Sequence, residues 1–167
     1  MTTAQVLQKN GRLVGTKHVD QLISRYKKER WVANTQFLGK PDSLSTWFGI
    51  EEITQFLRLA SEHGADGIKV YYGVYPEDFE GDIELRGRQT VVLVATKEKK
   101  TENGLFHKNL YVPHKGGAEI LAFNYGTACP PFCGGNDPLG TKGIPFGLEM
   151  ERVGLTILED EKGIKVI

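Results

Sequence analysis

The sequence lacks the features that would carry the chain into or across a membrane. It has no run of about 18 apolar residues, the length of a membrane-spanning helix. The stretch from Met1 to Gly11 is polar and has no apolar run after its charges, so we expect no secretory signal. Cysteine is scarce as well, with two in 167 residues. In a chain without export features we expect reduced thiols and a soluble protein in the cytoplasm.

The sequence also lacks a net charge, because Lys plus Arg and Asp plus Glu number 21 each. Without an overall field, neither nucleic acid nor a membrane surface is expected as a partner. The charges are unevenly distributed along the chain, however. Residues 1–40 hold eight basic and two acidic residues, a net charge of +6. Residues 41–92 hold four basic and ten acidic residues, a net charge of −6. The two segments can neutralise each other within one fold or across a homodimer.

The remaining composition is that of a folded chain. Its 167 residues weigh 18.6 kDa, which predicts one globular domain covering residues 1–167. Apolar residues make up 40% and charged residues 25%, so disordered and fibrous classes are excluded. Glycine is the outlier with 20 residues, which indicates many tight turns or one long irregular region.

Two amphipathic helices are expected in the N-terminal part of the chain. The first covers Thr16 to Arg30, and its last turns are rich in Lys and Arg, as suits a helix C-terminus. The second covers residues 50–63, with Gly49 as N-cap, Glu52 as the capping-box carboxylate and Gly64 as the stop. The apolar stripes that we expect to face the core are formed by Leu22, Ile23, Tyr26, Ile53, Phe56 and Leu57.

Strands follow the helices. Alternation from Ile68 to Tyr75 predicts a strand with one fully apolar face, made by Ile68, Val70, Tyr72 and Val74. The continuous β-branched run from Thr90 to Thr96 is typical of a central strand that is covered on both faces. Weaker strand patterns lie at Leu105–Val112, Glu119–Tyr125, Val153–Leu158 and Gly163–Ile167, the last two as a hairpin. The order predicts an α+β fold, a mainly antiparallel sheet of four to six strands with two N-terminal helices packed on one face.

Four short motifs follow one another between residues 45 and 133. They are the aromatic pair Trp47-Phe48, the Gly-initiated strand ending at Tyr75, the valine-rich strand ending in Thr96, and an Asn-Tyr-Gly … Pro-Pro stretch from Asn124 to Pro131. As a set they resemble a group of small uncharacterised bacterial proteins. The resemblance implies a folded domain over these residues. It implies no activity and transfers no functional residue.

One irregular region stands out between Gly126 and Gly147. It holds six glycines, four prolines and both cysteines, and long loops of this kind inside compact domains are usually functional or disordered. We expect an ordered loop with Phe132 as its apolar anchor, and we predict that it walls a pocket together with tyrosines of the first strand. The predicted pocket residues are Tyr71, Tyr75, Cys129, Phe132 and Cys133.

The two cysteines allow three interpretations. The ordinary one is a pair of reduced thiols packed under the loop, because free Cys is among the most buried residue types. A redox or disulfide role is the second. The third is a structural zinc site, because the Cys129-x3-Cys133 spacing suits one metal ion and His107 and His114 would complete the ligand set. Apart from this zinc alternative, no cofactor is expected.

Two charged stretches have ordinary explanations. An acidic stretch after the first strand, Glu77 to Glu84, lacks the calcium-loop signature and is expected to be a solvated loop. The basic residues Lys27, Lys28 and Arg30 are those of a cationic helix end.

The sequence contains no nucleophile elbow, no H-E-x-x-H pair and no dinucleotide-binding fingerprint. We therefore predict a non-enzymatic domain that acts by binding or self-association, with a homodimer as its expected state. The alternative is a metal- or thiol-dependent protein or enzyme centred on Cys129 and Cys133. No ligand class follows from the residues.

Overall fold

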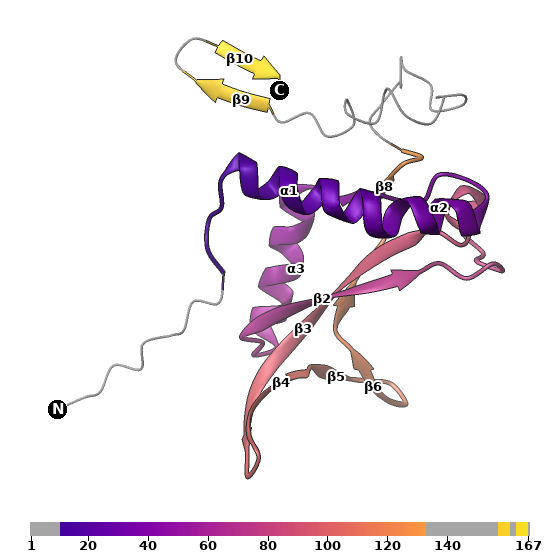
Figure 1. The fold of residues 1–167 in the computed structure, drawn as a ribbon. Coiled ribbons are helices and arrows are strands. Elements are labelled where there is room, and N and C mark those ends of the chain that lie inside the picture. Colours follow the sequence, from indigo (N-terminus) through magenta and orange to yellow (C-terminus); the bar gives the residue numbers. More distant parts are fainter. Residues whose placement is uncertain (1–10, 133–156, 161–162, 167) are drawn as a thin grey trace. The chain divides into compact units, whose positions relative to one another are not determined.

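In a computed structural model, the structure describes residues 11–132 and the strand residues 157–160 and 163–166. The chain falls into two compact units, Met1–Val32 with Lys142–Ile167, and Ala33–Thr141. Figure 1 shows their elements in chain order. The single domain expected from the chain length stays a prediction.

The first predicted helix is longer than expected. α1 (Thr16–Tyr26) continues through a π-helical turn, η1 (Lys27–Trp31), into α2 (Val32–Leu38). The predicted end at Arg30 is therefore wrong, because basic residues favour a helix C-terminus but do not stop the helix. The helix stops at Gly39, which has a φ of 71° and donates its amide to the carbonyl of Thr35 at 3.0 Å.

The C-terminal hairpin is confirmed. β9 (Ile157–Asp160) and β10 (Gly163–Val166) pair antiparallel, with Ile157 opposite Val166. The predicted strand residues 153–156 lie outside the described residues.

The second predicted helix is confirmed as α3 (Ile50–Glu62). The carboxylate of Glu52 accepts a hydrogen bond from the amide of Gly49 at 2.7 Å, which forms the expected capping box. The helix ends before Gly64, whose φ of 79° lies in the left-handed region that glycine adopts without strain.

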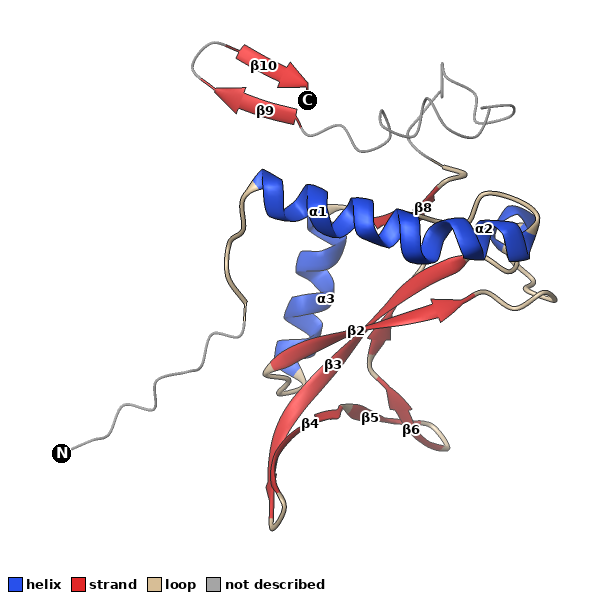
Figure 2. Ribbon diagram, in the orientation of Figure 1, coloured by secondary structure: helices blue, strands red, loops and turns tan. Residues whose placement is uncertain are grey.

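The largest sheet is built around one long central strand, β3 (Gln89–Thr101). β2 (Gly67–Val74) pairs with one edge of β3, and β4 (Gly104–Asn109) and β7 (Ala122–Phe123) pair with the other, all antiparallel (strands red in Figure 2). Thr90, Val94 and Thr96 are buried on one face of β3 and Ala95 is buried on the other. The predicted central strand that is covered on both faces is therefore confirmed.

A small hairpin branches from this sheet at Ala95. Leu110 donates its amide to the carbonyl of Ala95, Ala95 donates to Leu121, and Leu121 donates to Leu110, at 2.8–2.9 Å. These three bonds break both weaker predicted strands. The Leu105–Val112 pattern divides into β4 and β5 (Tyr111–His114), and the Glu119–Tyr125 pattern divides into β6 (Gly117–Ile120) and β7.

A short pair of strands was not expected from the sequence. β1 (Ser45–Trp47) pairs antiparallel with β8 (Thr127–Cys129), with Ser45 opposite Cys129. A 3-10 turn, η2 (Ile83–Leu85), lies between β2 and β3. The α+β class with antiparallel sheets is confirmed. Where one sheet of four to six strands was predicted, the described residues form a four-stranded sheet and three two-stranded ones.

The core of this unit lies between α3 and the sheet. Its buried members are Phe56, Ala60, Ala95 and Leu121, and Phe123 stacks on Phe56 with ring centroids 5.3 Å apart. Three other residues of the predicted stripes are exposed: Leu22 at 58%, Ile23 at 39% and Leu57 at 44%. Leu57 is wrong as a core residue because α3 turns Phe56 and Ala60, rather than Leu57, toward the sheet. The packing of the first helix on this sheet stays a prediction.

Candidate functional site

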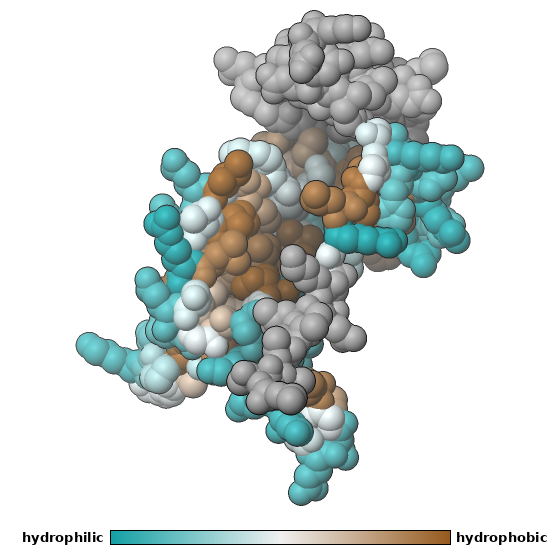
Figure 3. Space-filling view, turned by 90° about the vertical axis from the view of Figure 1, so that its left-hand side faces the viewer, coloured by the Kyte–Doolittle hydropathy of each residue, from teal (hydrophilic) through white to brown (hydrophobic). Residues whose placement is uncertain are grey.

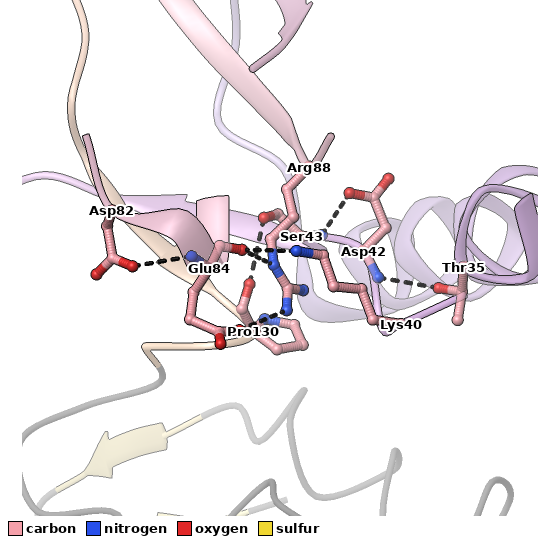
Figure 4. Close-up of polar contacts among 8 residues, drawn as sticks. All are labelled: Thr35, Lys40, Asp42, Ser43, Asp82, Glu84, Arg88 and Pro130. Atoms are coloured by element: carbon pink, nitrogen blue, oxygen red, sulfur yellow. Dashed lines mark hydrogen bonds and ion pairs between the residues drawn. The ribbon is translucent and has the colours of Figure 1, made fainter. Parts of the chain in front are cut away.

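The most elaborate polar arrangement centres on Asp42, which is 3% exposed (Figure 4). Its Oδ1 accepts the amides of Ser43 and Gln89, both at 2.7 Å, and its Oδ2 accepts Nδ2 of Asn34 at 3.2 Å. The amide of Asp42 donates to Oγ1 of Thr35 at 3.1 Å. The turn after α2 brings Asp42 to this place, so that one carboxylate joins the end of the helix to the start of β3.

Arg88 is the buried cation of the same arrangement and is 3% exposed. Its Nε donates to the carbonyl of Glu84, and its Nη2 lies 3.7 Å from the Glu84 carboxylate. Its Nη1 is buried and has no hydrogen-bond partner among the described residues. Burial lowers the pKa of Arg88, and the nearby carboxylates of Glu84 and Asp42 oppose that shift. The guanidinium therefore keeps a buried positive charge between two carboxylates.

Two further bonds tie this cluster to its surroundings. Oγ of Ser43, 2% exposed, donates to the carbonyl of Pro130 at 3.2 Å, and Nζ of Lys40 donates to the carbonyl of Glu84 at 3.3 Å. Among the described residues, no group of three or more His, Cys, Asp and Glu side chains could hold a metal ion. The carboxylate of Asp42 and the hydroxyls of Thr35 and Ser43 each bond to a backbone group. Its geometry suits holding loops together rather than turning over a substrate.

An aromatic cluster lies beyond the end of β2. The ring of Tyr75, 5% exposed, lies 4.7 Å from that of Phe79 and 6.5 Å from that of Tyr125. Oδ1 of Asn124 accepts the hydroxyls of Tyr75 at 3.1 Å and Thr90 at 3.3 Å, and also the amide of Tyr125. Tyr125 has a φ of 66°, a conformation that non-glycine residues rarely adopt. Asn124 holds this turn in place by accepting these three hydrogen bonds.

The structure does not bring the predicted pocket residues together in any described contact. Tyr71 donates its hydroxyl to Oδ1 of Asn109 at 3.0 Å, whereas Tyr75 donates to Asn124. Cys129 lies on β8, and Phe132 is 39% exposed. The amide of Phe132 donates to the carbonyl of Ala128 at 2.8 Å, and its role as the apolar anchor of the loop stays a prediction. Cys133 and the rest of the predicted loop lie outside the described residues.

Cys129 is disulfide-bonded, so the expectation of a reduced thiol at this position is wrong. A sulfur in a disulfide is not a thiolate, and the thiolate is the form that binds zinc. The two histidines of the predicted zinc set lie on different strands. His107 is on β4 opposite Glu98, and Nδ1 of His114 on β5 lies 3.6 Å from the carboxylate of Glu119. A zinc site at these four residues stays a hypothesis.

An exposed apolar surface follows β2. Val70, Tyr72 and Val74 are 56%, 83% and 67% exposed, and we call these three residues the β2 stripe. Alternation places them on the same face as Ile68, which packs against the core. The sequence predicted a strand with one fully apolar face here, and the alternation is the predicted one. Ile68 packs against the core that includes Phe56 and Ala60 of α3, whereas the three residues of the stripe are exposed beyond it. Figure 3 shows that apolar residues, in brown, also gather at the surface on the face that it draws.

Comparison with known proteins identifies no relative of this chain. The chain matches no family model, no curated protein and no solved structure. No described helix is long and apolar enough to cross a membrane. The resemblance carried by Trp47-Phe48, Tyr75, Thr96 and Asn124 stays a hypothesis. Any function must therefore be argued from the geometry of the chain.

Sequence reasoning missed the residues that organise the polar cluster. Asp42, Ser43 and Arg88 are polar residues for which exposure is the ordinary expectation. One local signal was available at the helix end, where Gly39 and Pro41 predict a tight turn just before Asp42. No local sequence signal predicts that Arg88 is buried, because its burial beside Asp42 depends on the folded structure.

Proposed function

We propose that this protein is a non-enzymatic binding module of the cytoplasm that self-associates as a homodimer, with the β2 stripe as its contact surface. The observation that carries the proposal is the exposure of Val70, Tyr72 and Val74 side by side on one strand. Single exposed apolar residues are normal on protein surfaces, whereas contiguous ones mark interaction sites. Water is removed from the stripe when a second apolar surface covers it.

The position of β2 supports the same proposal. Within the sheet that the structure describes, β2 is an outer strand that pairs only with β3. Outer strands are commonly protected from pairing by charged residues or proline. β2 has no proline, and Lys69 is its only charged residue. β4, the outer strand at the opposite side, carries His107 and Lys108 and lies opposite a highly charged part of β3.

Burial of the β2 stripe would contribute favourable free energy to dimerisation. Apolar surface contributes about 25 cal/mol per Å² removed from water, and one aromatic side chain can bury about 150–250 Å². Tyr72, the most exposed member of the stripe at 83%, is therefore expected to contribute most. Aromatic residues in the centre of an interface commonly carry a large share of the binding energy.

Light scattering during size-exclusion chromatography tests the proposal. At micromolar concentration we expect a particle of twice the chain mass of 18.6 kDa. Tyr72→Lys should shift the particle to a single chain mass, because a charge then replaces an apolar contact. Ile83→Lys is the matched control, since Ile83 is 65% exposed but lies in η2 and is not a member of the stripe. A monomeric parent protein, or equal effects of both substitutions, would contradict the proposal.

The alternative function is a metal- or thiol-dependent protein centred on Cys129 and Cys133. The disulfide bond of Cys129 supports it, since stable disulfides are rare in cytosolic proteins and are often redox-active when they occur there. We expect metal analysis of the reduced protein to separate the two functions. About one zinc per chain, lost in Cys129→Ser, would favour the alternative.

A further inference from the structure

We propose that the element that covers the β2 stripe is helix α1 of a second copy of this chain, and that the contact occurs twice in a two-fold dimer. This inference rests on the proposed function, because it names the partner of the same surface. It is argued from an exposed apolar helix face, from matching lengths and from complementary charges.

α1 presents an apolar face that is not buried. Val19, Leu22 and Ile23 are 37%, 58% and 39% exposed, and α1 has no buried residue. Their spacing of three and four residues places them on one side of the helix. A helix with one apolar side is typically stable because that side packs against another element. The face is therefore suited to a partner that offers an apolar sheet surface.

The two apolar surfaces have similar lengths. Tyr26 continues the same spacing and is half-buried, and from Val19 to Tyr26 the helix rises about 10 Å, at about 1.5 Å per residue. From Val70 to Val74 the strand rises about 13 Å, at about 3.3 Å per residue. One helix face of this length covers the three side chains of the stripe without leaving a long uncovered end.

Complementary charges set the direction of the contact. Lys28 and Arg30, just beyond α1, are exposed and form no ion pair with a described carboxylate. Asp78 and Glu80, just beyond β2, are also exposed and form no ion pair with a described basic group. Opposite charges at the rim of an interface speed association and fix the orientation of the partners. The basic end of α1 then lies beside the acidic end of the partner's β2, so the helix and the strand run in the same direction.

The remaining charges of α1 and the net charges of the two segments also favour a contact between α1 and the partner's β2. Arg25 is paired with Glu29 at 2.7 Å, and Asp20 is the only acidic residue of α1. Across the sequence, residues 1–40 have a net charge of +6 and residues 41–92 a net charge of −6. A contact between α1 and β2 of different copies joins these two segments, whereas a contact between two α1 helices would place like charges together.

Paired charge reversals test the inference. One variant carries Lys28→Glu and Arg30→Glu, and the other carries Asp78→Lys and Glu80→Lys. Each variant alone should dimerise at least about tenfold more weakly, because like charges then face each other. An equimolar mixture should recover the dimer, because each reversed helix meets a reversed acidic end on the other chain. Lys99→Glu with Lys100→Glu, an exposed pair at the end of β3, is the matched control and should leave the dissociation constant unchanged.

The outcomes are distinguishable by sedimentation. A parent protein that dimerises with an affinity unaffected by either reversal would overturn the inference and leave the proposed function standing. Recovery when all four substitutions are in one chain, without recovery in the mixture, would place the pairing within a single chain and also overturn it. A parent protein that is monomeric throughout would overturn both the inference and the proposed function. Circular dichroism of each variant checks that it is folded.

Discussion

Truncation of Phe56 is the most direct test of the core that the structure describes. Phe56 is 4% exposed on α3, and its ring stacks on Phe123 with an angle of 19° between the ring planes. Phe123 also contacts Phe48, with ring centroids 5.5 Å apart. Phe56→Ala removes the ring at one end of this row, and Phe123 cannot move into the space without losing its own packing against Phe48.

The expected cost follows from the depth of burial. Phe→Ala at a buried site typically lowers the free energy of unfolding by about 3–5 kcal/mol, as the sum of lost transfer energy and the cavity left behind. We expect about 3–4 kcal/mol for Phe56, because Ala60 and Ala95 beside it are small and cannot fill the cavity. Since whole domains are stable by only about 5–15 kcal/mol, this is a large fraction of the total.

Leu57→Ala is the matched control, on the next residue of the same helix. Leu57 is 44% exposed, so the same truncation should cost below about 1 kcal/mol. Urea unfolding followed by circular dichroism measures both variants, and the difference between their midpoints carries the test. Equal costs, or a larger cost at Leu57, would mean that the helix is rotated about its axis from the orientation given above.

Three further variants test the turn, the polar cluster and the helix cap by the same measurement. Gly126→Ala should cost about 1–3 kcal/mol, because its Cβ would lie 2.5 Å from atoms of Phe48 and Thr46, and a neutral result would contradict the packing of β8. Asp42→Ala should cost about 2–4 kcal/mol, because it removes the acceptor of the buried Ser43 amide and the part-buried Gln89 amide, and an unchanged midpoint would show that water replaces the carboxylate. Glu52→Ala should cost about 0.5–1 kcal/mol through the lost capping bond, and no loss would mean that the amide of Gly49 is equally well satisfied by water.

The elements that were predictable from the sequence are those whose signals are local. α3 begins and ends within one residue of its prediction, because Gly49, Glu52 and Gly64 act on their own neighbours. The central strand β3 was recognisable from its β-branched run, since only a strand covered on both faces suits such a run.

The elements that were not predictable depend on contacts between distant residues. The breaks at Leu110 and Leu121 exist because both residues bond to the backbone of Ala95 or to each other. Nothing in an apolar strand pattern distinguishes a residue at such a junction from its neighbours. β1 is three residues long and is defined only by its pairing with β8, so it carries too few residues for a periodic signal.

The polar cluster was unpredictable for a related reason. Buried charges are rare, so sequence reasoning assigns an Asp or Arg to the surface unless a motif indicates otherwise. Asp42 is buried because three donors converge on it from α2, the following turn and β3. That convergence is a property of the fold, and it exists only once those three segments are in place.

The β2 stripe shows that an apolar strand pattern leaves open whether its face is buried. Period-two alternation identifies which side chains share a face, but it does not say how far a covering element extends. α3 covers the strand at Ile68, and the same face then continues uncovered through Val70, Tyr72 and Val74. β2 therefore carries more apolar surface than its own unit buries. That excess is the physical reason to look for the partner of β2 in a second copy of the chain.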